Sequence, residues 1–106
     1  MPCQLLVMKQ IRPNKNIPFY SAPEFVKEAL RTYGPPALVG ERNFTDGLVR
    51  VRSLLFPSTA DYENWLSNPV TTTNVKERFK YNERNGIVET HQVFEIDGLD
   101  LIGIPF

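Results

Sequence analysis

Two kinds of pattern alternate along the chain, one typical of strands and one typical of helices. The segments 4–11, 37–44, 48–56 and 87–96 are short and rich in valine, leucine, isoleucine and phenylalanine, which predicts four strands. Thr45, Asp46 and Gly47 separate the second strand from the third and are typical of a hairpin turn.

A first helix is predicted after the loop around Pro13 and Pro18. Ser21 and Glu24 have the spacing of a capping box, and Pro23 costs no hydrogen bond in a first turn. Apolar residues then recur at every third or fourth position as far as Tyr33, where Gly34 and the two prolines that follow it end the pattern.

A second helical region is predicted from Ser58, which we expect to cap it, to Asn85 and Gly86, which close it. Asn68 precedes Pro69, and a residue before proline is driven out of the helical conformation. We therefore expect an interruption there and a helix that resumes at about Thr72.

The order of these elements is β-α-β-β-α-β. Two split strand-helix-strand units of this kind form the ferredoxin-like α+β fold, with an antiparallel four-stranded sheet and both helices on one face. With 106 residues, the chain has the length of a single domain, 1–106. Five large apolar residues crowd the last eight positions, so we expect 99–106 to be an apolar tail that docks on its own domain or on a neighbouring subunit.

Alternation along the strands suggests what the uncovered sheet face contains. If the valines of 48–56 and the apolar set of 87–96 meet the helices, the open face carries a polar group of residues: Arg50, Arg52, Glu89, His91 and Glu95. Because Leu48, Leu54, Phe56, Ile87 and Val93 share that parity, the open face is mixed, which is typical of a shared, partly buried surface.

The chain resembles the dimeric α+β barrel proteins, a group that includes antibiotic-biosynthesis-type monooxygenases and stress-responsive barrel proteins. The resemblance lies in length and element order, in the stretch from Phe56 to Trp65 (FPSTADYENW), and in the helix exit from Tyr81 to Ile87 (YNERNGI). It implies a homodimer joined through the open sheet faces, with the tail as a further contact, and a binding or structural module. A cofactor-independent monooxygenase-like enzyme, or another small-molecule enzyme acting in the barrel cavity, is the alternative.

His91 is the candidate catalytic residue, because it is the one histidine in the chain and the side chain best suited to proton transfer near neutral pH. Arg50 or Arg52 would hold an anionic or enol-like ligand beside it, and Glu89 shares their face. The competing interpretation is that these acids and arginines pair across strands, with His91 inside that network.

Trp65 is a further candidate for ligand binding, although a tryptophan at helical spacing is more often part of the core. Pro2 offers a third hypothesis. With Met1 removed, its secondary amine would resemble the catalytic base of the tautomerase superfamily, and Arg12 stands ten residues further on, as in that pattern.

Composition excludes several classes. Twelve basic residues balance twelve acidic ones, so the chain has no electrostatic footprint for nucleic acid or for an anionic membrane. The longest wholly apolar run, from Leu5 to Met8, is far short of a membrane span, and no signal peptide is expected. Cys3 is the one cysteine, which suggests a reducing, cytoplasmic setting. We expect no metal and no cofactor.

Overall fold

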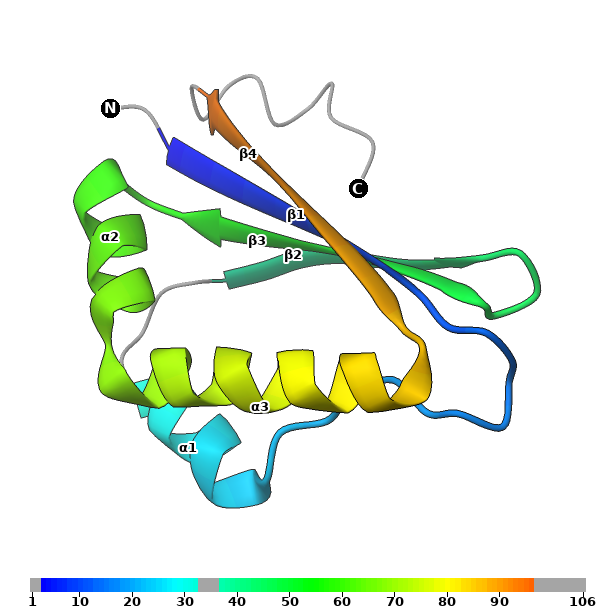
Figure 1. Ribbon diagram of the computed structural model, residues 1–106. Helices are drawn as coiled ribbons and strands as arrows, with labels where there is room; N and C mark the ends of the chain where they lie inside the picture. The colour runs from blue at the N-terminus through cyan, green and yellow to red at the C-terminus, as the bar shows by residue number, and fades with distance from the viewer. Residues whose placement is uncertain (1–2, 33–36, 97–106) are drawn as a thin grey trace.

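The computed structural model describes residues 3–32 and 37–96 (Figure 1). The elements are β1 (Cys3–Ile11), α1 (Glu24–Thr32), β2 (Ala37–Phe44), β3 (Val49–Phe56), α2 (Thr59–Ser67), α3 (Pro69–Asn85) and β4 (Val88–Ile96). The predictions for Pro2, for the helix end at 33–36 and for the tail 99–106 lie outside the described residues.

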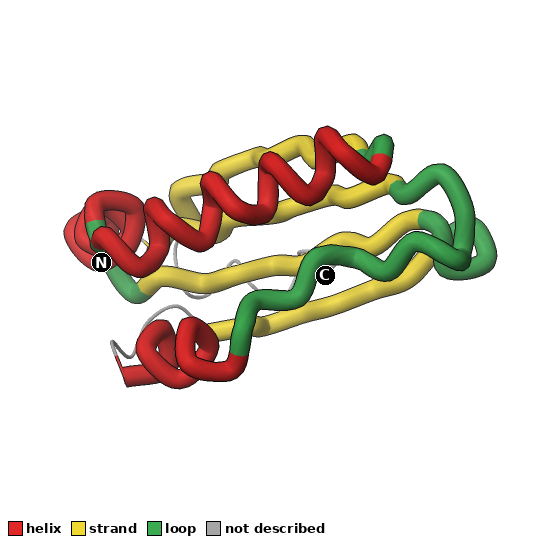
Figure 2. The backbone as a smooth tube through the Cα atoms, turned by 60° about the horizontal axis from the view of Figure 1, so that its bottom comes forward, coloured by secondary structure: helices red, strands yellow, loops and turns green. Residues whose placement is uncertain are grey.

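The four strands form one antiparallel sheet in the order β2-β3-β1-β4. The two central strands, β1 and β3, come from different strand-helix-strand units, which is the arrangement expected for a ferredoxin-like fold. Viewed from the helix side, α1 and α3 both lie over the strands (Figure 2). The predicted fold class is therefore confirmed, with the helices on one face of the sheet. Within residues 3–32 and 37–96, no helix lies on the other face, which is called the helix-free face below.

The helical region after β3 begins as predicted and continues differently. The Ser58 hydroxyl accepts a hydrogen bond from the Asp61 amide and caps α2. Asn68 is extended, as expected before proline, but α3 starts at once at Pro69 rather than near Thr72. Proline fits the first helical position, and Asn68 Oδ1 accepts from the amide of Val70. One residue is thus enough to separate the two helices.

The start of α1 is also corrected. The helix begins at Glu24, so Ser21 lies before its first turn, and the carbonyl of Pro23 accepts from the amides of Val26 and Lys27. At the end of α3 the prediction is confirmed, because Gly86 has φ 70° and ends the helix in the left-handed conformation.

The core lies between the sheet and α2. Leu6, Met8 and Phe56 are buried together, and Trp65 and Tyr62 pack against them. The Phe56 ring lies 5.0 Å from the ring of Tyr62 and 5.2 Å from that of Trp65, measured between centroids. This cluster anchors α2 to one end of the sheet through aromatic packing.

The prediction of which sheet face carries the polar residues is wrong. Arg50 and Glu89 stand in register with Gln10, and Arg52 and His91 stand in register with Met8. Gln4 of the same parity donates to Thr59 of α2, and Glu89 pairs with Arg78 of α3. The polar set, Glu95 included, therefore lies on the helix side of the sheet.

The helix-free face is correspondingly apolar at its ends. One row runs across all four strands through Phe44, Val49, Ile11 and Val88, and three of its members are well exposed. A second row, nearer the start of β1, contains Leu55, Leu5 and Phe94. In this second row Leu5 is fully buried and Phe94 is exposed. Exposed apolar side chains gathered on one sheet face, here Phe44, Ile11, Val88 and Phe94, are typical of a surface that pairs with another protein surface.

Candidate ligand site

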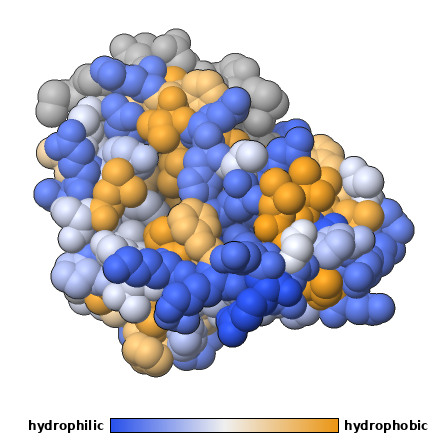
Figure 3. Space-filling model, in the orientation of Figure 1, coloured by the Kyte–Doolittle hydropathy of each residue, from blue (hydrophilic) through white to orange (hydrophobic). Residues whose placement is uncertain are grey.

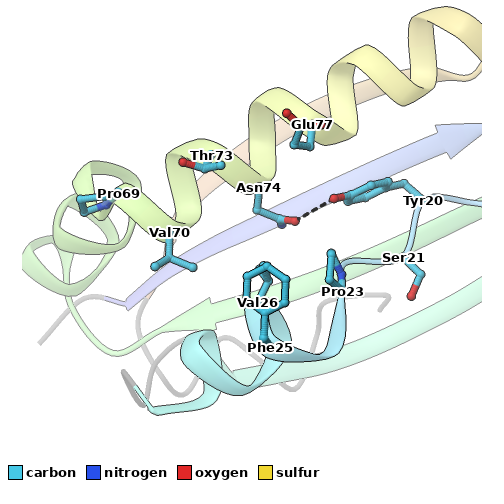
Figure 4. Close-up of a pocket in the computed structure, with 10 residues that line it drawn as sticks. All are labelled: Tyr20, Ser21, Pro23, Phe25, Val26, Pro69, Val70, Thr73, Asn74 and Glu77. Atoms are coloured by element: carbon cyan, nitrogen blue, oxygen red, sulfur yellow. Dashed lines mark hydrogen bonds between the residues drawn. The ribbon is translucent and has the colours of Figure 1, made fainter.

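A groove of about 550 Å³ opens between α1 and α3 (Figure 4). Its apolar wall on one side comes from Pro23, Phe25 and Val26, and on the other from Pro69 and Val70. This volume lies within the range of small-molecule sites, which are mostly apolar with a few placed polar groups. Phe25 is 77% exposed at this position, which leaves a large aromatic surface uncovered.

Polar groups stand along the α3 side of the groove. The hydroxyl of Tyr20 donates to Asn74 Oδ1 at 3.3 Å, the contact drawn as a dashed line in Figure 4. Glu77 also lines the groove, one turn further along α3, and its carboxylate lies 3.7 Å from Lys80 Nζ. The arrangement offers an amide, a phenol and a carboxylate to a ligand whose remaining surface is apolar.

The loop between β1 and α1 fixes the position of Tyr20. Phe19, the preceding residue, has the guanidinium of Arg12 4.8 Å and that of Arg50 4.6 Å from its ring centroid. The hydroxyl of Tyr81 donates to the carbonyl of Pro18 at 2.6 Å, and its ring lies 5.6 Å from that of Tyr20. The groove wall is therefore held from the sheet on one side and from α3 on the other.

A polar network centred on Glu89 lies under α3. Its carboxylate is 3% exposed and accepts from Gln10 Nε2 at 2.6 Å. Arg78 Nε lies 3.0 Å from one carboxylate oxygen, and His91 Nε2 lies 2.6 Å from the other. Gln10 in turn accepts from Arg50 at 2.6 Å, so the network spans three strands and a helix. These hydrogen bonds and opposite charges offset the free-energy cost of removing the Glu89 carboxylate from water.

These contacts shift two acid–base equilibria. Burial opposes ionisation of Glu89, but the hydrogen bonds from Gln10 and His91 and the charge of Arg78 outweigh it and hold the pKa of Glu89 below its ordinary value of 4.5. Burial, aided by the charge of Arg52, lowers the pKa of Arg50. Both groups are charged at neutral pH. The Glu89 carboxylate accepts a hydrogen bond from Gln10 and pairs with Arg78, and the Arg50 guanidinium donates to Gln10.

The shifted Glu89 predicts a pH dependence of stability. A carboxylate whose pKa is lower in the folded chain stabilises it above the unfolded pKa, and the contribution is lost as pH falls through the folded pKa. The difference in unfolding free energy between the wild type and Glu89→Gln should be constant above about pH 5 and shrink below 4.5. Urea unfolding at a series of pH values measures it. A difference that grows on acidification would contradict this assignment.

None of the residues predicted to bind ligand lines the groove. Arg50, Glu89 and His91 belong to the network under α3, and His91 also stacks on Phe79 with centroids 6.3 Å apart. Arg52 lies 3.1 Å from Glu41 of β2, across the sheet from that network. Trp65 packs against Phe56 in the core. Their part in ligand binding therefore stays a prediction, and the cross-strand pairing weighed beside it is what the geometry shows.

The groove residues were not predicted from the sequence. Val70, Asn74 and Glu77 are spaced by four and three positions, so they share one face of α3. The sequence does not reveal this shared face, because it predicts a helix that resumes only at about Thr72. Val70 then falls in the predicted interruption between the two helices. Tyr20 carries no local signal, since only the fold of its loop brings it to α3.

Within residues 3–32 and 37–96, no cluster of three histidine, cysteine or acidic side chains is placed to hold a metal ion. In the same part of the chain, none of the helices combines the length and the apolar character that a membrane span requires.

The chain matches no protein-family model and no curated protein. Among solved structures it is similar to a mutant of SnoaB, a cofactor-independent oxygenase from Streptomyces nogalater, with 10% identity, a TM-score of 0.49 and coverage of 86% of this chain and 90% of that one. It is also similar to Rv0793 from Mycobacterium tuberculosis, with 14% identity, a TM-score of 0.42 and coverage of 84% and 92%. The fold assignment is carried by the strand order itself.

Proposed function

We propose that this chain is a small-molecule-binding protein whose ligand occupies the groove between α1 and α3, and that it works as a homodimer in the cytoplasm. The observation that carries the proposal is the groove itself, about 550 Å³ with apolar walls and the polar groups of Tyr20, Asn74 and Glu77 along α3. A compact, largely apolar ligand with one or two hydrogen-bonding groups matches that lining.

Filling the groove tests this proposal. Val70→Trp places an indole in the groove and should weaken binding of 2-naphthol, a neutral aromatic probe, by about tenfold or more, since it removes the apolar volume the probe needs. Fluorescence titration of the probe measures the affinity. Lys76→Trp is the matched control, because Lys76 is exposed on the same helix and does not line the groove. Equal affinities of both variants would contradict the proposal.

The homodimer is proposed from the helix-free face of the sheet. Ile11, Val88, Phe44 and Phe94 all lie on that face and are 38–57% exposed. Pairing two such faces would bury these side chains, at roughly 25 cal/mol for each square ångström of apolar surface removed from water. Sheets packed in this way stand about 10 Å apart with their side chains interleaved.

Binding is better supported than catalysis. His91, the candidate base, is held by the Glu89 carboxylate and does not line the groove. The tautomerase hypothesis depends on Pro2, which lies outside the described residues. Arg12, its proposed partner, donates to the carbonyls of Gly47 and Ile17 at 2.9 and 3.1 Å, which is a structural role in the loop.

A further inference from the structure

Among the described residues, Glu77 is the one charged side chain that lines the groove between α1 and α3. No lysine, arginine or histidine of the described part of the chain belongs to that lining, so an anion would find no counter-charge there. The Glu77 side chain is 53% exposed, and its carboxylate lies 3.7 Å from Lys80 Nζ. An exposed ion pair of this kind contributes little free energy, so a cationic ligand can replace Lys80 at low cost.

The polar groups beside Glu77 can accept hydrogen bonds from the same ligand group. Asn74 precedes Glu77 by three positions, which places their Cβ atoms about 5–6 Å apart on one face of α3. The Tyr20 hydroxyl donates to Asn74 Oδ1, so the phenol oxygen can itself accept from a further donor. A primary ammonium has three N–H donors and no acceptor. It therefore matches a carboxylate, a phenol oxygen and an amide oxygen.

Aromatic rings in the groove favour the same sign of ligand charge. Tyr20 and Phe25 both line it, and Phe25 is 77% exposed. The face of an aromatic ring carries negative partial charge, so it attracts an ammonium and disfavours a carboxylate. The rings and the Glu77 carboxylate thus select together for a cation.

The groove is apolar at the end away from Glu77. Val70 lies seven positions before Glu77, which corresponds to about 10 Å along a helix. In Figure 4, Pro69 and Val70 lie toward one end of the groove, and Tyr20 and Glu77 lie toward the other. A ligand whose charged group is at Glu77 therefore extends its apolar body toward Val70.

We propose that the ligand of this groove is a primary amine with an apolar body, whose ammonium pairs with the Glu77 carboxylate while the body contacts Phe25 and Val70. This assignment rests on the proposed ligand-binding function and adds the charge that the ligand carries. Glu77 is then the residue that determines specificity, and Tyr20 and Asn74 accept hydrogen bonds from the same ammonium.

Three probes that share a naphthalene body test the proposal at pH 7: 2-naphthylmethylamine, 2-naphthylmethanol and 2-naphthoate. Fluorescence titration measures each affinity. We expect the amine, which is protonated at this pH, to bind about fivefold more tightly than the alcohol, and the carboxylate to bind most weakly.

Two variants identify the group that carries this preference. Glu77→Gln keeps the length of the side chain and removes its charge, so amine and alcohol should bind within about twofold of one another. Its affinity for the alcohol should stay within about twofold of the wild type, because the apolar lining is unchanged. Glu83→Gln makes the same change in net charge at an exposed position of α3 outside the groove, and it should keep the preference for the amine.

The outcomes separate this assignment from the proposed function. If none of the three probes binds, or if Val70→Trp binds the alcohol as tightly as the wild type does, the groove is not the ligand site and both proposals fail. If the alcohol binds and the amine binds no more tightly, the groove remains a ligand site and the cation specificity is wrong. A preference for the amine that persists in Glu77→Gln would overturn the role of Glu77. Thermal unfolding of each variant checks that it folds.

Discussion

Replacing Glu89 by alanine is expected to lower the free energy of unfolding by about 3–5 kcal/mol. The Glu89 carboxylate is 3% exposed, and its partner Arg78 is 12% exposed. Without the carboxylate, the Arg78 guanidinium loses its counter-charge where water reaches it poorly. Gln10 loses its acceptor at the same time and Asn82 loses a weaker one, at 3.4 Å. Urea unfolding at pH 7 measures the change.

Two further variants serve as comparisons for the Glu89→Ala measurement. Glu89→Gln keeps the shape and one carbonyl acceptor, so its loss should be smaller than that of the alanine variant. Glu83→Ala removes an exposed carboxylate from α3 and should change the free energy of unfolding by less than about 0.5 kcal/mol. If Glu89→Ala were as stable as Glu83→Ala, the network under α3 would not contribute to the fold.

Replacing Val88 by lysine is expected to weaken self-association by about 100-fold or more. Val88 is 57% exposed and belongs to the apolar row on the helix-free face. If that face pairs with a second copy, the lysine enters an apolar interface and must be dehydrated. A loss of about 2.7 kcal/mol corresponds to 100-fold in the dissociation constant. Sedimentation equilibrium measures that constant.

Val93 provides the matched control for this substitution. It is a valine of the same strand with 46% exposure, but its parity places it on the helix side. Val93→Lys should leave the dissociation constant within about threefold of the wild type. Equal effects of the two variants would show that the helix-free face is not the dimer interface.

The elements were predictable because their signals are local. The turn through Thr45, Asp46 and Gly47 has positive φ at all three residues. Aspartate and glycine favour this conformation and mark the turn in the sequence, whereas the β-branched Thr45 adopts it against its own preference. Ser58 caps α2 and Gly86 ends α3, each by a side-chain or backbone preference that acts within a few residues. Pro69 was misinterpreted because proline both disfavours helix before itself and starts a helix well.

The faces of the sheet were assigned wrongly for a reason that is not local. Polar strand residues usually face water, yet Gln10, Arg50 and Glu89 lie under the helices because they satisfy one another and meet Arg78. Nothing in the alternation shows that Arg78, eleven positions before Glu89, pairs with it. The groove likewise joins Tyr20 to Asn74, which are 54 positions apart.

The most direct test of the central proposal, ligand binding between α1 and α3, is a map of backbone amide shifts in ¹⁵N-labelled protein during titration with 2-naphthol. We expect the shifts to concentrate at Tyr20, Val26, Val70 and Asn74, the residues that face one another across the groove. At the same probe concentrations they should be much smaller in the Val70→Trp variant, in line with its weaker binding. Shifts confined to Ile11, Val88 and their neighbours on the helix-free face, with α1 and α3 unaffected, would contradict the proposal.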